Sequence, residues 1–200
     1  MPKEEIKISV IIPVYNTSKY LESCLDSVVS QSLTEIEIII VNDCSTDNSQ
    51  EIIDRYGAND SRFKSVIHRA NKGLPSARNS GVSKASGKYI IHLDSDDSWI
   101  SNNALQILYD TAEEDGCDVL RFNGMETGYS TNTIFKPYDA ANVDFFESPD
   151  LWKFRSVFLF LFRKDFLDIN GFTFNPKLSI GEDAIYLSLV LPKTKRISSL

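Results

Sequence analysis

The sequence predicts an α/β fold in which a mostly parallel central sheet is flanked by helices. Short apolar runs alternate with segments whose apolar residues recur at helical spacing, which indicates strands and helices in turn. The apolar runs are continuous, as expected of strands that are covered on both faces. Hydrophobic residues make up 42% of the 200 residues, enough to bury one substantial core. Strands that alternate with helices imply right-handed crossovers between parallel neighbours.

Five strands are predicted before residue 123, with four helices between them. Ser101 is the expected N-cap of the fourth helix. The predicted strands cover residues 8–14, 36–41, 63–67, 89–93 and 119–122. Helices are predicted where apolar residues recur at helical spacing, in segments 21–29, 52–56, 74–85 and 104–112.

The rhythm of the sequence changes after Asn123. Residues 124–150 are rich in Thr, Asn, Tyr and Asp without clear periodicity, and we expect a loop or a hairpin excursion there. Residues 152–162 are expected to return to the core, with a core strand at their apolar end. Two further helices are expected over residues 164–170 and 182–191.

Composition and charge exclude some classes of function. The net charge of −7 and the pI near 4.9 argue against a nucleic-acid partner, because phosphate backbones are held by clustered Lys and Arg. Three cysteines without disulfide or zinc spacing fit a reducing cytosol. The charged N-terminus does not resemble a secretory signal, and the apolar run 157–162 is far shorter than the ~20 residues that span a bilayer. We therefore expect a cytoplasmic protein without a transmembrane segment, with room for peripheral contact at the inner face of a membrane.

Three carboxylates follow directly after the apolar strand over residues 89–93. In an extended chain, alternating positions place Asp94 and Asp96 on a common side, where both could share one cation. Carboxylate oxygens suit hard divalent cations such as Mg²⁺ or Mn²⁺, and open α/β sheets bind ligands beyond the carboxyl ends of their strands. The competing interpretation is a helix N-cap with acidic neighbours, but a cap would use one of the acids and not all three. The cluster therefore predicts a metal and phosphate site.

Two further polar loops follow the neighbouring strands. Asp43 stands at the end of the second strand, where a side chain can reach a bound nucleotide, and Asp47 is well placed to cap the next helix. Both are also ordinary turn residues. The loop over residues 71–81 contains glycines that permit close backbone approach, and Arg78 offers a fork of donors suited to phosphate or carboxylate. An Arg paired with a nearby acid only to hold the loop is, for Arg78 alone, an equally good interpretation.

The last predicted helix opens with Glu182 and Asp183. Adjacent acids at a helix start are favoured by the helix dipole, so the pair alone says little. A transfer site at the carboxyl edge of the sheet still needs a group that accepts a proton, and Asp183 is the candidate. His68 and His92 are expected to be a strand-end residue and a hydrogen-bonded core histidine rather than metal ligands.

Five motifs occur in a fixed order along the chain: Val10-Ile11-Ile12-Pro13-Val14-Tyr15-Asn16, Asn42-Asp43-Cys44-Ser45-Thr46-Asp47, residues 71–81, Leu93-Asp94-Ser95-Asp96-Asp97 and Gly181-Glu182-Asp183. Together they resemble the family 2 inverting glycosyltransferases. The resemblance runs from about residue 8 to about residue 189, and the combination is specific although each motif alone is not.

The resemblance implies a GT-A fold, a nucleotide-diphosphate sugar donor that is most often UDP-linked, and a divalent metal, Mn²⁺ or Mg²⁺. The acceptor would be a glycan or a lipid-linked molecule, and the role would be in cell-surface polysaccharide or glycan synthesis. Residues 1–200 would form a single domain. Its part at about 6–123 would bind the nucleotide sugar, and its part at about 124–200 would serve the acceptor.

The motif positions imply a role for each site residue. Asp96 would be the principal metal ligand, with Asp94 near the ribose or the metal and Ser95 beside them in the donor site. Asp183 would be the catalytic base. The remaining donor contacts would come from Pro13, Val14 and Tyr15 in the nucleoside pocket, Asp43 at the base and Arg78 near the diphosphate.

Two departures from the family pattern limit what it implies. Asn42 stands where many relatives carry a second acid, which weakens a ribose contact there. The chain stops at Leu200 whereas relatives usually continue, so a truncated chain or a minimal enzyme that adds one sugar is expected. A Gln-x-x-Arg-Trp element is absent from the sequence, and a processive polysaccharide synthase is therefore not expected.

Three other functions fit parts of the sequence. A phosphohydrolase would use Asp94 as nucleophile and Asp96 as acid/base, but no clear downstream Lys partner follows. A calcium loop that starts at Asp94 would need Gly and Glu where Trp99 and Leu105 stand. A nucleotide-sugar-binding module that has lost catalysis remains an alternative from outside enzymology.

Overall fold

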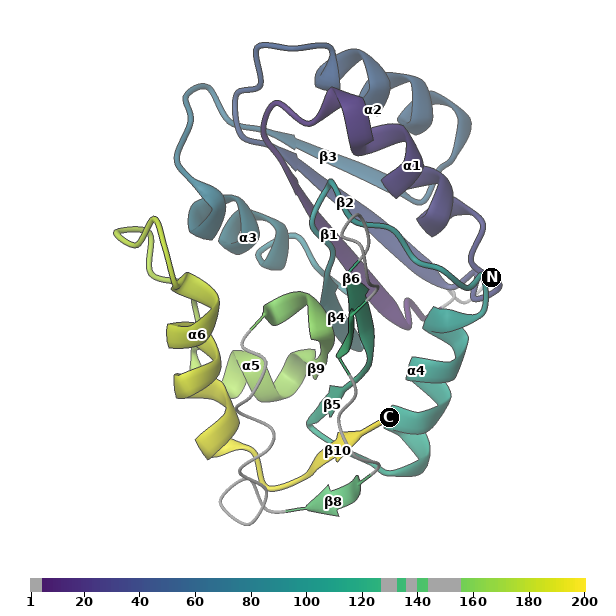
Figure 1. Cartoon of the computed structure of the whole chain (residues 1–200), viewed down its shortest axis with the longest axis vertical. Coiled ribbons are helices and arrows are strands. Elements are labelled where there is room, and N and C mark those ends of the chain that lie inside the picture. The colour runs from purple at the N-terminus through teal and green to yellow at the C-terminus, as the bar shows by residue number, and fades with distance from the viewer. Residues whose placement is uncertain (1–4, 127–132, 136–139, 144–155) are drawn as a thin grey trace.

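The computed structural model describes residues 5–126, 133–135, 140–143 and 156–200, which build an eight-stranded sheet with helices on both sides (Figure 1). In their spatial order the strands are β3 (Phe63–Ile67), β2 (Ile36–Asn42), β1 (Ile8–Val14), β4 (Tyr89–His92), β9 (Phe160–Arg163), β5 (Val119–Arg121), β10 (Ile197–Ser199) and β8 (Ala140–Val143). The pairings make β9 and β8 antiparallel to their neighbours, and the other strands share one direction. The predicted mostly parallel sheet is confirmed.

The helices divide between the two sides of this sheet. The periodicity of β2 explains how, because alternate side chains of a strand point to opposite faces. Ile39 and Val41 pack with Ala77 of a covering helix, whereas Ile38 and Ile40 belong to the main core. One side carries α1 (Ser18–Val29), α2 (Ser49–Asn59) and α4 (Ala104–Glu114), and the other carries α3 (Leu74–Val82), α5 (Lys164–Asn170) and α6 (Glu182–Val190) (Figure 1).

The strand order creates a topological switch between β1 and β4. The chain moves outward from β1 to β3 and then returns through α3 on the opposite side to form β4. A glycine allows α3 to lie close to the sheet: a Cβ at Gly81 would stand 2.4 Å from Cγ2 of Ile11, far inside normal contact distance. Open α/β sheets bind their ligands at such a switch, outside the carboxyl ends of the strands.

The apolar segment over residues 152–162 differs from its sequence interpretation. Residues Val157–Leu159 form a 3₁₀ helix, and β9 starts only after it. The first four residues of the segment lie outside the described part of the chain. β9 is inserted antiparallel between β4 and β5, where Leu161 pairs with both Ile91 and Leu120. An apolar run buried on both faces carries no information about strand direction or neighbours, which is why this insertion was not predicted.

The region over residues 124–150 is described only in part. β6 (Gly124–Glu126) and β7 (Thr133–Phe135) pair antiparallel, which confirms a hairpin excursion for the residues that are described. β8 instead joins the edge of the main sheet, next to β10. Within the described ranges, no helix is both long enough and apolar enough to cross a membrane.

One expected helix cap is present and another is not. Asp47 accepts hydrogen bonds from the backbone N–H of Ser49 at 3.0 Å and of Ser18 at 2.9 Å, and so ties together the starts of α2 and α1. Burial opposes the charge of Asp47, but these hydrogen bonds outweigh it and lower its pKa to about 2. The expected cap at Ser101 is wrong: α4 begins at Ala104, and its N-cap residue Asn103 makes no side-chain cap. Instead, Oε1 of Gln31 accepts the N–H of Leu105 in the first turn at 3.0 Å.

Candidate active site

The polar residues that the sequence singled out meet around the switch between β1 and β4. Asp43 follows β2, Asp94 follows β4, and Arg78 lies on α3, which covers the neighbouring strands. Asp183 lies in the first turn of α6, 105 positions after Arg78 in the sequence, and its side chain reaches the same place. The fold therefore joins residues from separate segments into one site.

Residues 94–97 form a tight turn and not an extended chain. The backbone N–H of Asp97 donates to the carbonyl of Asp94 at 3.0 Å. The Asp94 side chain is partly buried against Arg78, whereas Asp96 is exposed. The expectation of an extended chain is therefore wrong, because the backbone turns between Asp94 and Asp97, but Asp94 and Asp96 still line one cleft together. The helix-cap alternative is also excluded, since α4 begins only at Ala104.

The three carboxylates of this turn repel one another. Burial raises the pKa of Asp97 to about 6, and the negative charges of Asp94 and Asp96 add to the increase. The Asp96 side chain makes no hydrogen bond or ion pair with any residue that the structure describes. In the same ranges, no three His, Cys, Asp or Glu side chains are grouped so that they could hold a metal ion. A cation here would therefore complete its ligand set from substrate phosphates or water, as Mg²⁺ commonly does.

Arg78 connects the two parts of the site and has only 1% of its surface exposed. Its Nη2 donates to Oδ1 of Asp94 at 2.9 Å, and its Nη1 donates to Oε1 of Glu182 at 3.2 Å and to Oδ1 of Asp183. The guanidinium carbon lies 5.4 Å from the centre of the Phe174 ring. Arg78 thus pairs with acids, as one of its two interpretations expects. Its position near a diphosphate stays a prediction.

Asp183 is a stronger base than its residue type suggests. Burial raises its pKa to about 6, although the charge of Arg78 and a backbone hydrogen bond from Val157 act in the opposite direction. The Val157 N–H donates to Oδ2 at 3.0 Å, and the side chain keeps 17% of its surface exposed. A carboxylate with a pKa closer to neutral accepts a proton more readily than one at the reference value of ~3.9.

Asp43 is buried and anchored by three donors. Its Oδ1 lies 2.6 Å from Nδ1 of His68 and 2.9 Å from the backbone nitrogen of Lys72, and its Oδ2 accepts the N–H of Gly73 at 2.7 Å. These bonds tie the end of β2 to the loop that leads into α3, and thus to the helix that carries Arg78. The predicted contact with a nucleobase stays a prediction.

The other residues expected at the donor differ in how much they expose. Pro13 and Val14 belong to the fully buried strand β1, whereas Tyr15 exposes 48% of its surface. Among these three, Tyr15 is the one whose side chain a ligand can reach. Ser95 is buried, and its hydroxyl lies 2.9 Å from the hydroxyl of Thr17, so it joins the loop after β1 to the carboxylate turn.

A cleft of about 790 Å³ opens beside the carboxylate turn. Asp94, Asp96 and Asp97 line one part of it, and Trp99 and Phe122 line another. The sequence gives no sign of this cleft, because its walls come from segments that are far apart along the chain. The lining residues fall within 93–108, 122–125 and 156–159 and include Leu200.

Of the two histidines, His92 departs from its expected role and His68 does not. Neither ring nitrogen of the fully buried His92 has a hydrogen-bond partner among the described residues, so the expectation of a hydrogen-bonded core histidine is wrong. Burial, and then the charge of Arg78, lowers the pKa of His92 well below its ordinary value, which keeps the ring neutral. His68 lies at a strand end as expected, but its bond to Asp43 was not foreseen. The part of Glu182 in binding Arg78 was not foreseen either, although it adjoins Asp183 in the sequence.

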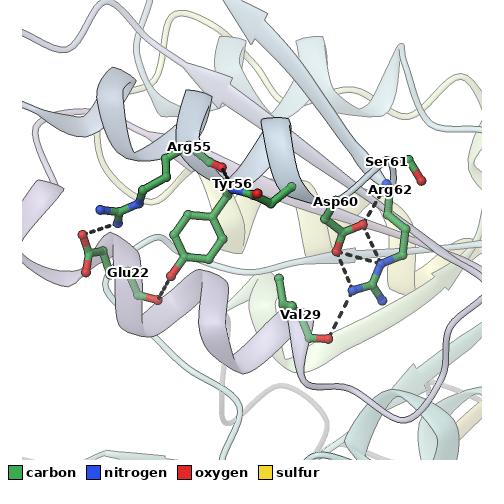
Figure 2. A pocket seen from close by; sticks show the side chains of 8 residues that line it. Glu22, Val29, Arg55, Tyr56, Asp60, Ser61 and Arg62 are labelled. Carbon is green, nitrogen blue, oxygen red and sulfur yellow. Dashed lines mark hydrogen bonds and ion pairs between the residues drawn. The ribbon is translucent and has the colours of Figure 1, made fainter.

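A second groove of about 680 Å³ lies between α1 and α2, away from the strand ends (Figure 2). Its charged residues are matched with one another. Arg55 pairs with Glu22, and Nη2 of Arg62 donates to Oδ2 of Asp60 at 2.6 Å and to the carbonyl of Val29 at 3.1 Å (Figure 2). The groove therefore offers no unmatched charge to a ligand, and we do not include it in the active site.

Comparison with known proteins identifies the class to which this fold and site belong. The sequence profile described as "Glycosyl transferase family 2" matches residues 9–180, and the chain belongs to this family. The structure resembles that of residues 1–349 of TarS from S. aureus, with a TM-score of 0.87 and 29% sequence identity over 97% of this chain and 58% of that one. Crystal structures of the same TarS segment with UDP and with UDP-GlcNAc give TM-scores of 0.85 and 0.86. The predicted GT-A fold is confirmed.

Two relatives match nearly the whole chain. The uncharacterized glycosyltransferase EpsJ of Bacillus subtilis is 31% identical over 205 residues, which cover 96% of this chain and 58% of EpsJ. The poly(ribitol-phosphate) beta-glucosyltransferase of Bacillus spizizenii is 32% identical over 202 residues, which cover 96% of this chain and 31% of that enzyme. This chain thus spans less than two thirds of the length of either relative.

Proposed function

We propose that this chain forms the donor-binding and catalytic part of an inverting glycosyltransferase that moves a sugar from a UDP-sugar to an acceptor hydroxyl. The observation that carries the proposal is the junction at Arg78, where one guanidinium holds the carboxylate after β4 and the first turn of α6 together. Group transfer requires the donor-binding and proton-accepting groups to lie side by side. The UDP and UDP-GlcNAc complexes of TarS support a UDP-linked donor.

The proposal divides the single domain into a donor side and an acceptor side. Residues of about 6–123 would bind the nucleotide sugar, with Asp43 and the exposed ring of Tyr15 at the nucleoside. Residues of about 124–200 would face the acceptor, a glycan or a lipid-linked saccharide used in a cell-surface polymer. The relative from Bacillus spizizenii is a poly(ribitol-phosphate) beta-glucosyltransferase, which supports a polymeric acceptor.

Asp96, with Asp94 beside it, would hold a divalent cation such as Mn²⁺ or Mg²⁺. The residues fit such an ion, because Asp96 is exposed without a described partner and the pKa of Asp97 is raised partly by its neighbours' charges. One oxygen of Asp94 is engaged by Arg78, which leaves Asp96 as the freer ligand. When bound, a divalent cation offsets the charge that builds on the departing nucleoside diphosphate.

Asp183 would take the proton of the acceptor hydroxyl while that oxygen attacks the sugar carbon from the face opposite the diphosphate. The configuration at the sugar carbon inverts in consequence. Arg78 holds Oδ1 of Asp183 and the Val157 N–H holds Oδ2, so the carboxylate has a fixed orientation. With a pKa of about 6 the group is deprotonated at neutral pH, and proton transfer occurs late, once attack has made the hydroxyl acidic.

A binding titration followed by a transfer assay tests the proposal. We expect UDP and UDP-sugars to bind, more tightly when Mn²⁺ is present, and UDP to be released only when a suitable acceptor is added. Failure to bind any nucleotide sugar would contradict the proposal. Donor binding without transfer or hydrolysis in any acceptor screen would indicate a binding module instead, and rapid turnover of small phosphate esters would indicate a phosphohydrolase.

A further inference from the structure

A chain of hydrogen bonds runs behind Asp43 and connects three segments of the fold. Oδ1 of Asp43 lies 2.6 Å from Nδ1 of His68, and Nε2 of the same ring lies 2.9 Å from the hydroxyl of Ser80. His68 is buried directly after β3, and Ser80 lies on α3. The end of β2 is thus linked through an imidazole to the helix that covers the sheet.

The chemistry of these groups determines where the hydrogens lie. The backbone N–H groups of Lys72 and Gly73 both donate to the Asp43 carboxylate, and an ionised carboxylate only accepts hydrogen bonds. Nδ1 of His68 therefore carries the proton that it donates to Asp43. In a neutral imidazole Nε2 then accepts, and the Ser80 hydroxyl donates to it. The ring is held in one tautomer and one orientation.

The Asp43 carboxylate retains one unused acceptor position. A carboxylate offers about four lone-pair positions on its two oxygens. His68 and the N–H of Lys72 occupy Oδ1, and the N–H of Gly73 occupies one side of Oδ2. The remaining position is therefore on Oδ2, in a side chain that is 4% exposed.

We propose that His68 and Ser80 are positioning residues that aim this last acceptor of Asp43 at a nucleobase, and that they thereby select a base with an N–H at that edge. The inference rests on the proposed function, in which Asp43 contacts the base. Uracil donates from N3, whereas cytosine presents a lone pair at the same ring position. An ionised carboxylate attracts the first and repels the second, so a fixed Asp43 favours UDP-linked over CDP-linked donors.

A pair of variants at His68 tests this role. The amide nitrogen of Asn, like Nδ1 of His, is bonded to Cγ, so His68→Asn retains a donor that can reach Asp43. His68→Leu has nearly the same size as the Asn variant but offers no donor. The dissociation constants of UDP and CDP are measured by calorimetry for the wild-type chain and both variants. Thermal unfolding of each variant reports whether it is folded.

We expect His68→Leu to weaken UDP binding roughly tenfold and to reduce the preference for UDP over CDP by a similar factor, because Oδ1 loses one of its two donors and the N–H groups of Lys72 and Gly73 alone hold the carboxylate less firmly. His68→Asn should restore most of both quantities. Ser80→Ala should act in the same direction as His68→Leu but more weakly, since Nε2 loses its partner while Asp43 keeps its donor. As a control, Tyr89→Phe removes a hydroxyl that donates to Glu113 at 2.6 Å, at the opposite end of β4, and should change neither affinity.

Equal losses of UDP and CDP affinity in His68→Leu, with their ratio preserved, would overturn the inference, because they would indicate support of the loop alone. Unchanged affinities for both nucleotides would overturn it as well. If His68→Leu does not fold, an unchanged UDP preference in Ser80→Ala is the result that decides against it. A wild-type chain that binds neither nucleotide would overturn the proposed function, which separates that failure from the failure of the inference.

Discussion

The carboxylates that follow β2 and β4, the two strands on either side of β1, have opposite surroundings. Asp43, after β2, is buried and accepts from three donors, whereas Asp96, after β4, is exposed and accepts from no described residue. The pKa of Asp97 is raised to about 6, in part by its acidic neighbours. Asp43 has three of its acceptor positions occupied before any ligand arrives, whereas Asp96 has no described partner that offsets its charge. The difference shows two requirements. A carboxylate that recognises a ligand through a hydrogen bond must be held in a fixed position, whereas carboxylates that bind a cation must keep negative charge that no protein group offsets.

The largest effect on catalysis is expected at Asp183, which Arg78 links to Asp94 in the carboxylate turn after β4. Asp183→Asn keeps the shape of the side chain but removes the proton acceptor, so turnover should fall by roughly 10²–10⁴-fold. The dissociation constant of UDP should stay unchanged, because the group does not contact the donor in the proposed mechanism. Steady-state kinetics and calorimetry measure the two effects, and turnover within a few-fold of wild type would remove Asp183 from the mechanism.

The dependence of the wild-type turnover rate on pH also tests whether Asp183 is the catalytic base. The pKa of Asp183 is raised to about 6, and only its deprotonated form accepts a proton. The rate should therefore be high at neutral pH and fall as the pH decreases through about 6. A profile that stays flat down to the ordinary pKa of an Asp would contradict the assignment of the base.

Arg78 offsets the negative charge of Asp94, whereas the charge of Asp96 has no described partner. Replacing Arg78 should therefore strongly destabilise the fold. Arg78→Leu would leave Asp94, Asp183 and Glu182 close together without their cation, and breaking a buried ion pair in this way costs about 3–5 kcal/mol of unfolding free energy. Chemical denaturation measures the loss. The matched control is Arg55→Leu, whose ion pair with Glu22 has side chains 56% and 53% exposed and should contribute far less to the unfolding free energy. If both variants lost a similar amount of unfolding free energy, the buried ion pairs of Arg78 would contribute no more than an exposed pair, which would contradict this prediction.

The variant Asp96→Ala tests whether UDP binding at the end of β4 depends on a metal ion, in contrast to binding at the end of β2. Affinity for UDP measured with Mn²⁺ should fall by about tenfold, equivalent to about 1.4 kcal/mol. Affinity without metal should change little, because Asp96 would act only through the cation. Asp43→Asn, in contrast, should weaken UDP binding under both conditions. Normal affinity of Asp96→Ala for UDP with Mn²⁺ would refute its assignment as the principal ligand.

The smallest effect concerns stability against pH. The folded-state pKa of Asp97 is about 6, above the ordinary value of 3.8, so the folded protein binds this proton more tightly than the unfolded chain. The resulting stabilisation is present below about pH 4 and is lost as the pH rises through 6. Asp97→Asn should therefore gain stability relative to wild type at pH 7 compared with pH 4. The gain should be less than about 1 kcal/mol, because only part of the side chain is removed from water and solvent screens the charge of the rest. Chemical denaturation of both proteins at pH 4 and pH 7, with EDTA present to remove metal ions, measures this gain in stability. Added Mn²⁺ should reduce the gain at pH 7.

The sequence predicts the first half of the fold well, because the information there is local. Continuous apolar runs mark β1 to β4, and the periodic residues mark α1 and α2. Asp47 could be identified as a cap because a cap and its helix are neighbours in sequence. The aspartate cluster also stands out locally, although the turn at residues 94–97 cannot be told from an extended chain by composition alone.

What the sequence could not predict depends on contacts between distant residues. Glu182 and Asp183 bind Arg78 across 104 and 105 positions, and no periodic pattern reports that meeting. The link from His68 to Asp43 depends on the parallel pairing of β2 with β3, which sets the two residues side by side. β10 has three residues, too few for any periodicity to mark it as a strand.

The insertion of β9 has a consequence for how the chain assembles. β5 reaches β4 only through β9, so one side of β4 keeps unpaired N–H and C=O groups until residues 160–163 arrive. During synthesis the nascent protein would therefore emerge with an open edge in what becomes the middle of its sheet. Such an edge is a place where two incomplete molecules can join wrongly, and the late arrival of one short antiparallel segment is what closes it.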